Sequence, residues 1–408
     1  MPATLPDGDP APPDGALPEG ALDGLGGRPF GVYVHVPFCA TRCGYCDFNT
    51  YTAAELGEAP GASRATWVEG ALAEVRLARR VLGEVELPVS TVFVGGGTPT
   101  LLPAEDLVRV VDELGAEFGL APDAEVTTEA NPESVGPEGL GRLRAGGFTR
   151  VSFGMQSSRP HVLDVLERAH TPGRVAVAVA EARSAGFEHV NLDLIYGAPG
   201  ESLDDWRDSV ESALAAGPDH VSAYALVVEQ GTRLAARVRR GEVTAPDDDD
   251  LADKYFLADD LLTAAGLRWY EVSNWAATPE ARCRHNLLYW TGADWWGVGP
   301  GAHSHVGGTR WWNAKHPAAW ASHLAAGRSP AHAREVLGDD TRRVERVLLE
   351  LRLEPGLDVG VLDPAGRAAA TRAAARGLLD PAALAAARAV LTPRGRLLAD
   401  AVVRDLLG

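Results

Sequence analysis

The sequence is poor in cysteine and lysine, and it lacks long apolar runs. Only four cysteines occur among its 408 residues, and lysine occurs only at Lys254 and Lys315. No apolar run reaches the roughly 18 residues that a membrane-spanning helix requires. No Lys or Arg precedes Arg28, and no apolar segment there has the length of a signal-peptide core. We therefore expect a chain of the reducing cytoplasm with no integral membrane segment.

Positive charge is scarce as well. The 38 Lys and Arg residues are outnumbered by 56 Asp and Glu residues, which gives a net charge of −18 and an isoelectric point near 5.0. This sign is unfavourable for binding a phosphate backbone, so we expect no nucleic acid among the partners. Hydrophobic residues make up 46% of the chain and charged residues 23%, as in ordinary globular proteins. The length allows two or three domains with a sizeable buried core.

From residue 29 onward, short β-branched runs alternate with helical patterns. The expected strands span residues 32–36, 91–94, 125–129, 150–153, 190–195 and 221–226. The expected helices span residues 67–81, 104–118, 162–169, 174–185 and 203–216. About six repeats of strand and helix predict an α/β fold with a parallel sheet and outer helices, either a βα barrel or a fraction of one. In such folds, functional residues gather at the C-terminal ends of the strands.

Composition and periodicity divide the chain into four parts. Residues 1–28 hold twelve Gly or Pro and no apolar periodicity, so we expect a disordered acidic tail. Residues 29–265 form the expected barrel, and residues 266–330 form a connecting segment. Residues 331–408 are expected to form a small, mainly helical C-terminal domain, because apolar residues recur there at helical spacing. A turn at residues 391–395 resembles the edge of a winged-helix-like unit.

Three of the four cysteines stand close together, directly after the first expected strand. Cys39, Cys43 and Cys46 lie within eight residues, and closely spaced thiolates are typical ligands of an iron–sulfur cluster. Cys283 is the only other cysteine, so the simplest count leaves one iron open to bind a cofactor directly. The alternative is a structural zinc site completed by Cys283 or His35, because such a site needs four protein ligands.

Glycines and acids follow the next expected strands. Residues 95–99, Gly-Gly-Gly-Thr-Pro, come after the second strand, and glycine lets a backbone approach a ligand closely. By itself this run is equally compatible with a plain tight turn. Glu129 ends the third strand, and Asp193 interrupts the apolar fifth strand. Burying an unpaired acid is costly, so we expect Asp193 to face a polar ligand or partner.

The order Cys-x3-Cys-x2-Cys, followed by the glycine run at 95–99, resembles the radical S-adenosylmethionine (SAM) superfamily. This resemblance implies a partial (β/α)6 barrel and a [4Fe-4S] cluster held by Cys39, Cys43 and Cys46. It also implies that SAM chelates the fourth iron and that an electron from the reduced cluster cleaves its sulfonium to a 5′-deoxyadenosyl radical.

The same resemblance assigns residues to the SAM pocket. The implied contacts are Tyr33, Gly96, Gly97, Thr98, Glu129, Gln156, Arg168 and Asp193. Glu129 and Arg168 would hold the methionine end of SAM. Asp193 and Gln156 would hold its ribose hydroxyls.

From Tyr33 through the C-terminal unit, the chain resembles the branch that contains oxygen-independent coproporphyrinogen III oxidases and haem chaperones. The oxidases carry a further cysteine two residues beyond the third cluster ligand, where this sequence has Phe48. The segment His285-Asn-x-x-Tyr289-Trp290 matches a motif of the chaperones. The resemblance therefore implies a haem chaperone, with haem as cargo, acceptor haemoproteins as partners and a reducing electron donor. The alternative is an oxidase or dehydrogenase that decarboxylates the propionates of coproporphyrinogen III.

His285 is the candidate ligand for the haem iron, because histidine is a frequent axial ligand and aromatic residues surround it in the sequence. His303 and Cys283 are lesser candidates. The competing interpretation is that His285 is a hydrogen-bonded packing residue beside a tryptophan-rich core. The sequence leaves dimerisation open.

Overall fold

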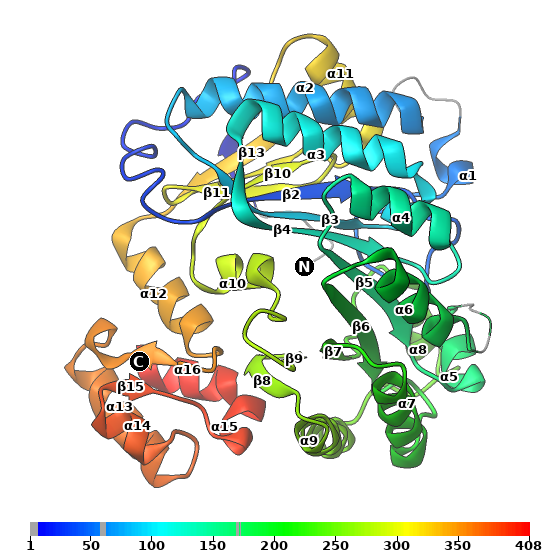
Figure 1. The fold of residues 1–408 in the computed structure, drawn as a ribbon. Coiled ribbons are helices and arrows are strands. Elements are labelled where there is room, and N and C mark those ends of the chain that lie inside the picture. Colours follow the sequence, from blue (N-terminus) through cyan, green and yellow to red (C-terminus); the bar gives the residue numbers. More distant parts are fainter. Residues whose placement is uncertain (1–6, 58–62, 169–170, 172) are drawn as a thin grey trace.

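The computed structural model describes residues 7–57, 63–168, 171 and 173–408. Within them a single sheet of 13 strands runs in the order β1-β13-β12-β11-β10-β2-β3-β4-β5-β6-β7-β9-β8, beside a separate two-stranded sheet. Its middle consists of strands that pair in parallel and in sequence order: β2 (Phe30–Val36), β3 (Val89–Gly96), β4 (Leu120–Ala130), β5 (Arg150–Gln156), β6 (His189–Tyr196) and β7 (His220–Ala225). This curved arrangement confirms the expected α/β class and the partial (β/α)6 barrel (Figure 1).

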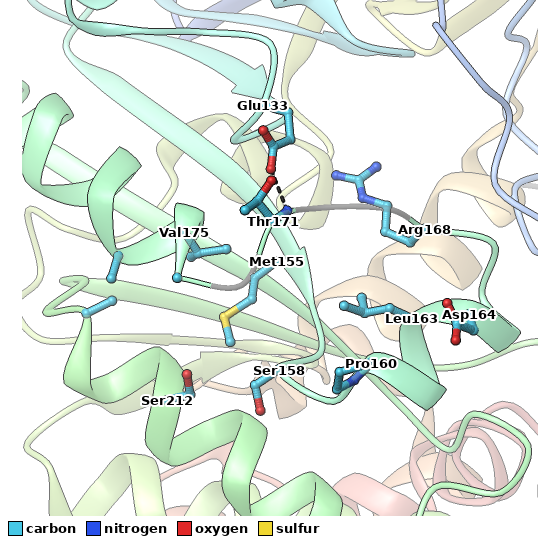
Figure 2. A pocket seen from close by; sticks show the side chains of 13 residues that line it. Glu133, Met155, Ser158, Pro160, Leu163, Asp164, Arg168, Thr171, Val175 and Ser212 are labelled. Carbon is cyan, nitrogen blue, oxygen red and sulfur yellow. Dashed lines mark hydrogen bonds between the residues drawn. The ribbon is translucent and has the colours of Figure 1, made fainter.

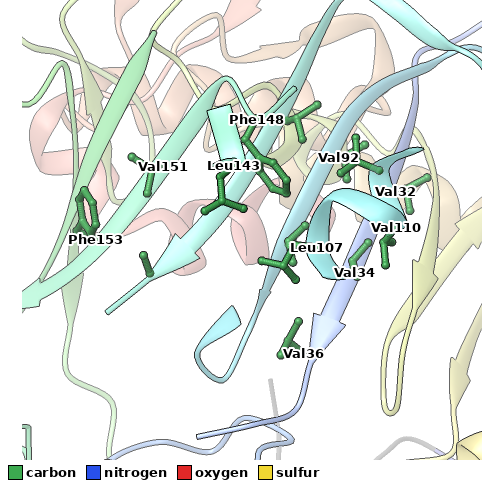
Figure 3. Close-up of a cluster of buried hydrophobic side chains, with 14 of the residues drawn as sticks. Val32, Val34, Val36, Val92, Leu107, Val110, Leu143, Phe148, Val151 and Phe153 are labelled. Atoms are coloured by element: carbon green, nitrogen blue, oxygen red, sulfur yellow. The ribbon is translucent and has the colours of Figure 1, made fainter. Parts of the chain in front are cut away.

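Helices cover the outer, convex face of the parallel strands (Figure 1). They are α2 (Arg64–Leu82), α3 (Ala104–Phe118), α4 (Pro137–Ala145), α5 (Pro160–Val165), α6 (Arg174–Ala185), α7 (Leu203–Ala215) and α9 (Asp248–Ala264). Side chains alternate between the two faces of a strand. Val32, Val34 and Val92 are buried in the core that also contains Leu107 and Val110 of α3 (Figure 3). The alternate positions on the same strands therefore face the concave side.

The sheet is extended at both edges by further strands, most of which pair antiparallel. One edge carries β10 (Asp294–Val298), which is parallel to β2, followed by β11 (His303–Val306), β12 (Thr309–Asn313) and β13 (Ala331–Val336). The other edge carries β9 (Asn274–Ala276) and β8 (Arg268–Glu271). The remaining elements of this part are α1 (Ala53–Leu56), η1 (Pro99–Leu101), α8 (Arg233–Arg239), α10 (Arg284–Trp290) and α11 (Pro317–Ala325). Helix α10 lies on the concave side of the barrel (Figure 1).

The structure differs from the expectation of a disordered tail for residues 7–28. Strand β1 (Asp9–Pro10) pairs antiparallel with β13, and Ser329 N–H donates to Pro13 O at 2.7 Å. Leu17 and Leu25 pack against the main core. The Gly- and Pro-rich composition hides these few apolar anchors, which fix the segment along the sheet edge. Residues 1–6 lie outside the described part of the chain.

The C-terminal unit has a hydrophobic core of its own, separate from that of the barrel. It contains α12 (Asp339–Glu350), β14 (Leu357–Asp358), η2 (Val359–Val361), α13 (Pro364–Ala375), α14 (Pro381–Ala385), β15 (Arg388–Ala389), α15 (Pro393–Leu397) and α16 (Ala399–Leu407). It lies apart from the helices that cover the barrel (Figure 1). Strand β13 belongs to the main sheet, so the unit begins with α12 rather than at the expected residue 331.

The C-terminal unit docks on the segment that contains β8. The guanidinium of Arg396 stacks 3.7 Å above the centre of the Trp269 ring. Glu354 N–H donates to Tyr270 O at 2.8 Å, and Arg282 forms an ion pair with the Glu354 carboxylate at 2.6 Å. Among the residues that the structure covers, we find no helix that is both long and apolar enough to cross a membrane.

Candidate functional site

The three clustered cysteines lie on the loop of residues 37–51, which we call the cysteine loop. Its ends are tied together, because Cys39 N–H donates to Tyr51 O at 3.0 Å and Tyr51 N–H donates to Pro37 O at 2.7 Å. Cys39, Cys43 and Cys46 all have free, half-buried thiols. Burial raises the pKa of Cys46 to about 11, and the neighbouring sulfurs of Cys43 and Cys39 also act to raise it. The loop therefore carries three thiols on one short segment, and the Cys46 thiol would need a bound metal to remain a thiolate.

The zinc alternative gains no support from this geometry. In the described residues, no three or more His, Cys, Asp or Glu side chains, the three loop cysteines included, stand close enough together to hold a metal ion, so the choice between zinc and an iron–sulfur cluster depends on whether a fourth protein ligand faces the loop. Cys283 is buried away from the loop, with its Sγ 3.8 Å from Glu125 Oε1. His35 is engaged by Tyr33 Oη and by Asn49 O, each at 2.9 Å.

The glycine run at 95–99 packs directly on the cysteine loop. Gly97 N–H donates to Val36 O at 2.8 Å, and Thr98 N–H donates to Phe38 O at 2.7 Å. A Cβ atom at Gly97 would lie 2.4 Å from Phe38 O and 3.0 Å from Cys39 Sγ. Only glycine permits this approach of the two segments, so the run is more than a plain turn.

Glu129 lies beside the same glycines. Its carboxylate accepts a hydrogen bond from Gly96 N–H at 2.9 Å. Burial raises the pKa of Glu129 to about 8, with a further contribution from the nearby Asp193 carboxylate. A group with this pKa ionises fully only when a cation or additional donors arrive.

Arg168 joins the cysteine loop to the end of β5. Its Nη2 donates to Gly154 O at 2.9 Å, and its Nη1 lies 3.8 Å from Cys43 Sγ. Its buried Nε finds no hydrogen-bond partner among the described residues. Next to it, Gln156 adopts a left-handed backbone with φ of 64°, which is strained for a residue other than glycine. A buried donor without a partner indicates that an acceptor from a ligand belongs here.

Asp193 faces polar partners on the concave side, as the sequence predicts. Its carboxylate accepts hydrogen bonds from Ser152 Oγ at 2.6 Å and from Asn191 Nδ2 at 2.8 Å. Burial raises its pKa above the ordinary value. Tyr33, Glu129, Gln156, Arg168 and Asp193 are thus all placed on or at the rim of the concave face. Their contacts with SAM remain predictions.

His285 is held entirely by the protein. Its Nδ1 lies 2.8 Å from Thr91 Oγ1, and its Nε2 lies 2.8 Å from Tyr289 Oη. The residue is 1% exposed, and burial lowers its pKa to about 3, so the imidazole is neutral. Both ring nitrogens are therefore engaged, which favours the packing interpretation over iron ligation. His303, the lesser candidate, stacks on Trp312 with the ring centres 5.9 Å apart.

Sequence reasoning missed a set of buried polar residues at the base of the barrel. Arg150, His220 and Tyr270 are each 1% exposed, and Glu125 accepts the N–H groups of Arg284 and His285 at 3.0 Å. These residues could have been located from the strict alternation of polar and apolar residues in strands such as β7, His-Val-Ser-Ala-Tyr-Ala.

A cavity of about 630 Å³ lies outside the barrel, where α5, α6 and α7 meet (Figure 2). Met155, which alternates with the inward-facing Gly154 on β5, contributes to its wall together with Leu163, Val175 and Ser212. Arg168 lines it with its side chain and also belongs to the concave site. This cavity is therefore a neighbour of the candidate site rather than part of it.

Comparison with known proteins agrees with this geometry. The family model "Radical SAM superfamily" matches residues 33–213. In the solved structures, coproporphyrinogen III oxidase (HemN) from Escherichia coli superimposes with a TM-score of 0.79 over 95% of this chain and 91% of that one. With 22% sequence identity, this likeness shows the fold alone. The fold and the cysteine loop define a radical SAM protein.

Two relatives show to which family within the radical SAM superfamily the chain belongs. "Heme chaperone HemW" from Mycobacterium tuberculosis is 58% identical over 383 residues, which cover 94% of this chain and 96% of the relative. "Heme chaperone HemW" from Escherichia coli is 37% identical over 278 residues, which cover 68% of this chain and 70% of the relative. The chain therefore belongs to the HemW family of the radical SAM superfamily.

Proposed function

We propose that this protein binds haem and transfers it to acceptor haemoproteins, with a [4Fe-4S] cluster and SAM bound in the barrel. The observation that carries the proposal is the concave site, in which three thiols adjoin Glu129 and Arg168, in a chain similar to proteins named haem chaperones along almost its whole length. The free thiols fit a reducing compartment such as the cytoplasm.

The residues present fit the cluster and SAM. Cys39, Cys43 and Cys46 would hold three irons, and the orphaned Nε of Arg168 would donate to an acceptor beside them. Glu129, with its pKa of about 8, would lose its proton when an ammonium group binds next to it, because an adjacent positive charge favours the ionised form. When bound, the cluster supplies the electron for reductive cleavage of SAM.

The cargo would bind at α10 on the concave side. Trp290 and Asn286 of this helix lie close to the buried carboxyl group of Glu271 on β8. Tyr224 is 41% exposed although it extends from the concave face of β7. The exposed Tyr224 ring, together with the half-buried Trp290 on α10, suits the flat, apolar surface of a porphyrin. His285 would become an iron ligand only by giving up one of its two hydrogen bonds.

A transfer assay tests the proposal. Anaerobically reconstituted protein is loaded with haem and mixed with an acceptor apo-haemoprotein, and the Soret absorption is followed after the two are separated. We expect the haem to move to the acceptor. A parallel incubation with coproporphyrinogen III, dithionite and SAM is analysed by porphyrin chromatography. Robust protoporphyrin formation, with no haem transfer, would replace the chaperone assignment by the oxidase.

The cluster ligands are tested separately by iron content and visible absorption. Replacing Cys39, Cys43 and Cys46 by Ala should abolish cluster formation. Cys283→Ser is the matched control, because Cys283 is buried beside Glu125 rather than in the cysteine loop. Loss of the cluster in Cys283→Ser would contradict the assignment of three ligands.

A further inference from the structure

A chain of four hydrogen bonds runs from Asp193 across the base of the barrel. Asn191 Nδ2 donates to Asp193 at 2.8 Å, and His220 Nδ1 lies 2.6 Å from Asn191 Oδ1. His220 Nε2 lies 2.8 Å from Tyr270 Oη, which accepts Cys283 N–H at 3.1 Å. The chain connects three strands, β6, β7 and β8, with the residue that caps α10.

The direction of every bond in this chain is determined. A carboxylate only accepts, so the Asn191 atom that faces Asp193 is the amide nitrogen, and Oδ1 faces His220. His220 is neutral, because burial lowers its pKa well below the ordinary value and the Arg150 charge acts in the same direction. A neutral imidazole has one donor, so Nδ1–H donates to Asn191 and Nε2 accepts the Tyr270 hydroxyl proton. All donors point toward Asp193.

The side chains that form these hydrogen bonds are buried, so water cannot take the place of any of them. His220 and Tyr270 are 1% exposed and Asn191 is 4% exposed. Asn191 Oδ1 has a second donor, Ser222 Oγ, at 3.4 Å, but this long contact is a poor replacement for His220 Nδ1–H in a low-dielectric environment. Asn191 would then be free to turn away from Asp193, because Ser152 and Ser222 also lie within hydrogen-bond distance of its Nδ2.

We propose that His220 is a positioning residue for SAM: through Asn191 it fixes the orientation of the Asp193 carboxylate toward the ribose hydroxyls. The inference rests on the proposed SAM binding and extends it to a residue that does not touch the cofactor. The same chain ends at the backbone of Cys283, so the helix that carries the His-Asn-x-x-Tyr-Trp motif and the cofactor site share one hydrogen-bonded unit.

Equilibrium dialysis with labelled SAM, on anaerobically reconstituted protein, measures the effect. His220→Leu should raise the SAM dissociation constant about tenfold, the usual size for a lost buried hydrogen bond. His220→Asn should stay within about threefold of the wild type, because its amide can replace the Nδ1–H donor. A purely structural role would not predict this rescue by Asn.

A double-mutant comparison tests whether His220 affects SAM binding through Asp193. Asp193→Asn should weaken SAM binding, and adding His220→Leu should weaken it no further, because the two residues act through one group. The control is His305→Leu, a buried histidine whose Nδ1 pairs with Ala293 O in the antiparallel part of the sheet. It should leave the dissociation constant unchanged.

The results distinguish a failure of the proposed SAM binding from a failure of the positioning role alone. If wild-type protein does not bind SAM, the cofactor part of the proposed function fails and this inference fails with it. If the wild type binds SAM and His220→Leu binds equally well, or if its effect adds fully to that of Asp193→Asn, only the positioning role is wrong. If His220→Leu does not fold, Tyr270→Phe removes a single hydroxyl from the same chain. Unchanged SAM binding by Tyr270→Phe would then overturn the inference.

Discussion

Asn49, three residues beyond the last cysteine of the loop, donates its side-chain amide to Pro300 O at 2.9 Å. The same Nδ2 also donates to Lys315 O at 2.8 Å, and Tyr51 Oη donates to Asn49 Oδ1 at 3.2 Å. A Cβ atom at Gly301 would lie 2.6 Å from this amide. The turn that follows β10, the neighbour of β2 in the sheet, therefore braces the cysteine loop, although Pro300 lies 251 residues after Asn49 in the sequence.

Asn49→Ala should loosen the cysteine loop. Two backbone carbonyls would lose a donor, at a cost of about 1–3 kcal/mol in the free energy of unfolding. Iron should leave the reconstituted protein faster, as measured with a chromogenic chelator under anaerobic conditions. Thr392→Ala is the control, because it removes a helix cap in the C-terminal unit and should destabilise the protein by about 1 kcal/mol without changing iron release. Equal release rates in both variants would show that Asn49 does not brace the loop.

Gly97→Ala should prevent correct closure of the cysteine loop on the glycine run. The added methyl group would meet the backbone at Phe38 O and the Cys39 sulfur, and neither can move without shifting the loop. We expect reconstituted Gly97→Ala to hold well under half of the wild-type iron, measured per chain together with the visible absorption of the cluster.

The control for this change is Gly136→Ala. A Cβ at Gly136 would meet no atom within 4 Å, and its φ of −127° suits any residue, so iron content should match the wild type. Full cluster occupancy in Gly97→Ala would contradict the close packing of the two segments.

The barrel and its cysteine loop were predictable because their signals are local. Alternating β-branched runs located β2 to β7, and α6 has the predicted bounds, Arg174–Ala185. Each of these features depends on neighbouring residues, so periodicity and capping rules are sufficient.

The features that were not predicted depend on contacts between distant segments. Glu74 lies within the long helix α2, and nothing in its sequence neighbourhood indicates that Asn313 and Trp320 surround it. His220 gains its role only from Asn191 and Tyr270 on two other strands. Such pairings follow from the assembled sheet, not from the pattern of any single segment.

Arg396→Ala should weaken the docking of the C-terminal unit. The guanidinium stacks on Trp269 and lies 3.4 Å from the Asp259 carboxylate, and both partners belong to the barrel side. A cation–π contact in this partly buried position contributes about 1–2 kcal/mol, so the thermal midpoint should fall by a few degrees. Arg394→Ala on the same helix changes an exposed side chain and should have little effect. Equal midpoints for both variants would exclude this contact as a docking determinant.

Glu74 is a buried carboxyl group with three donors around it. It accepts Gly299 N–H at 2.8 Å, Trp320 Nε1–H at 2.7 Å and Asn313 Nδ2–H at 2.7 Å. Burial nevertheless dominates and raises its pKa to about 7 from an ordinary 4.5. The folded state therefore binds the proton more tightly than the unfolded state does. The resulting stabilisation is complete below pH 4.5 and is lost as the pH rises through 7.

Glu74→Gln removes this titration. The shift corresponds to roughly 3 kcal/mol, so the unfolding free energy of wild type minus that of Glu74→Gln should decrease by about that amount between pH 5 and pH 8. Urea unfolding at several pH values measures the difference. Glu69→Gln is the matched control, because it makes the same substitution on the exposed side of the same helix, where no carboxyl group is buried. Parallel profiles for Glu74→Gln and wild type would instead mean that the carboxyl group keeps its ordinary pKa in the folded chain, and that its three donors fully compensate for its burial.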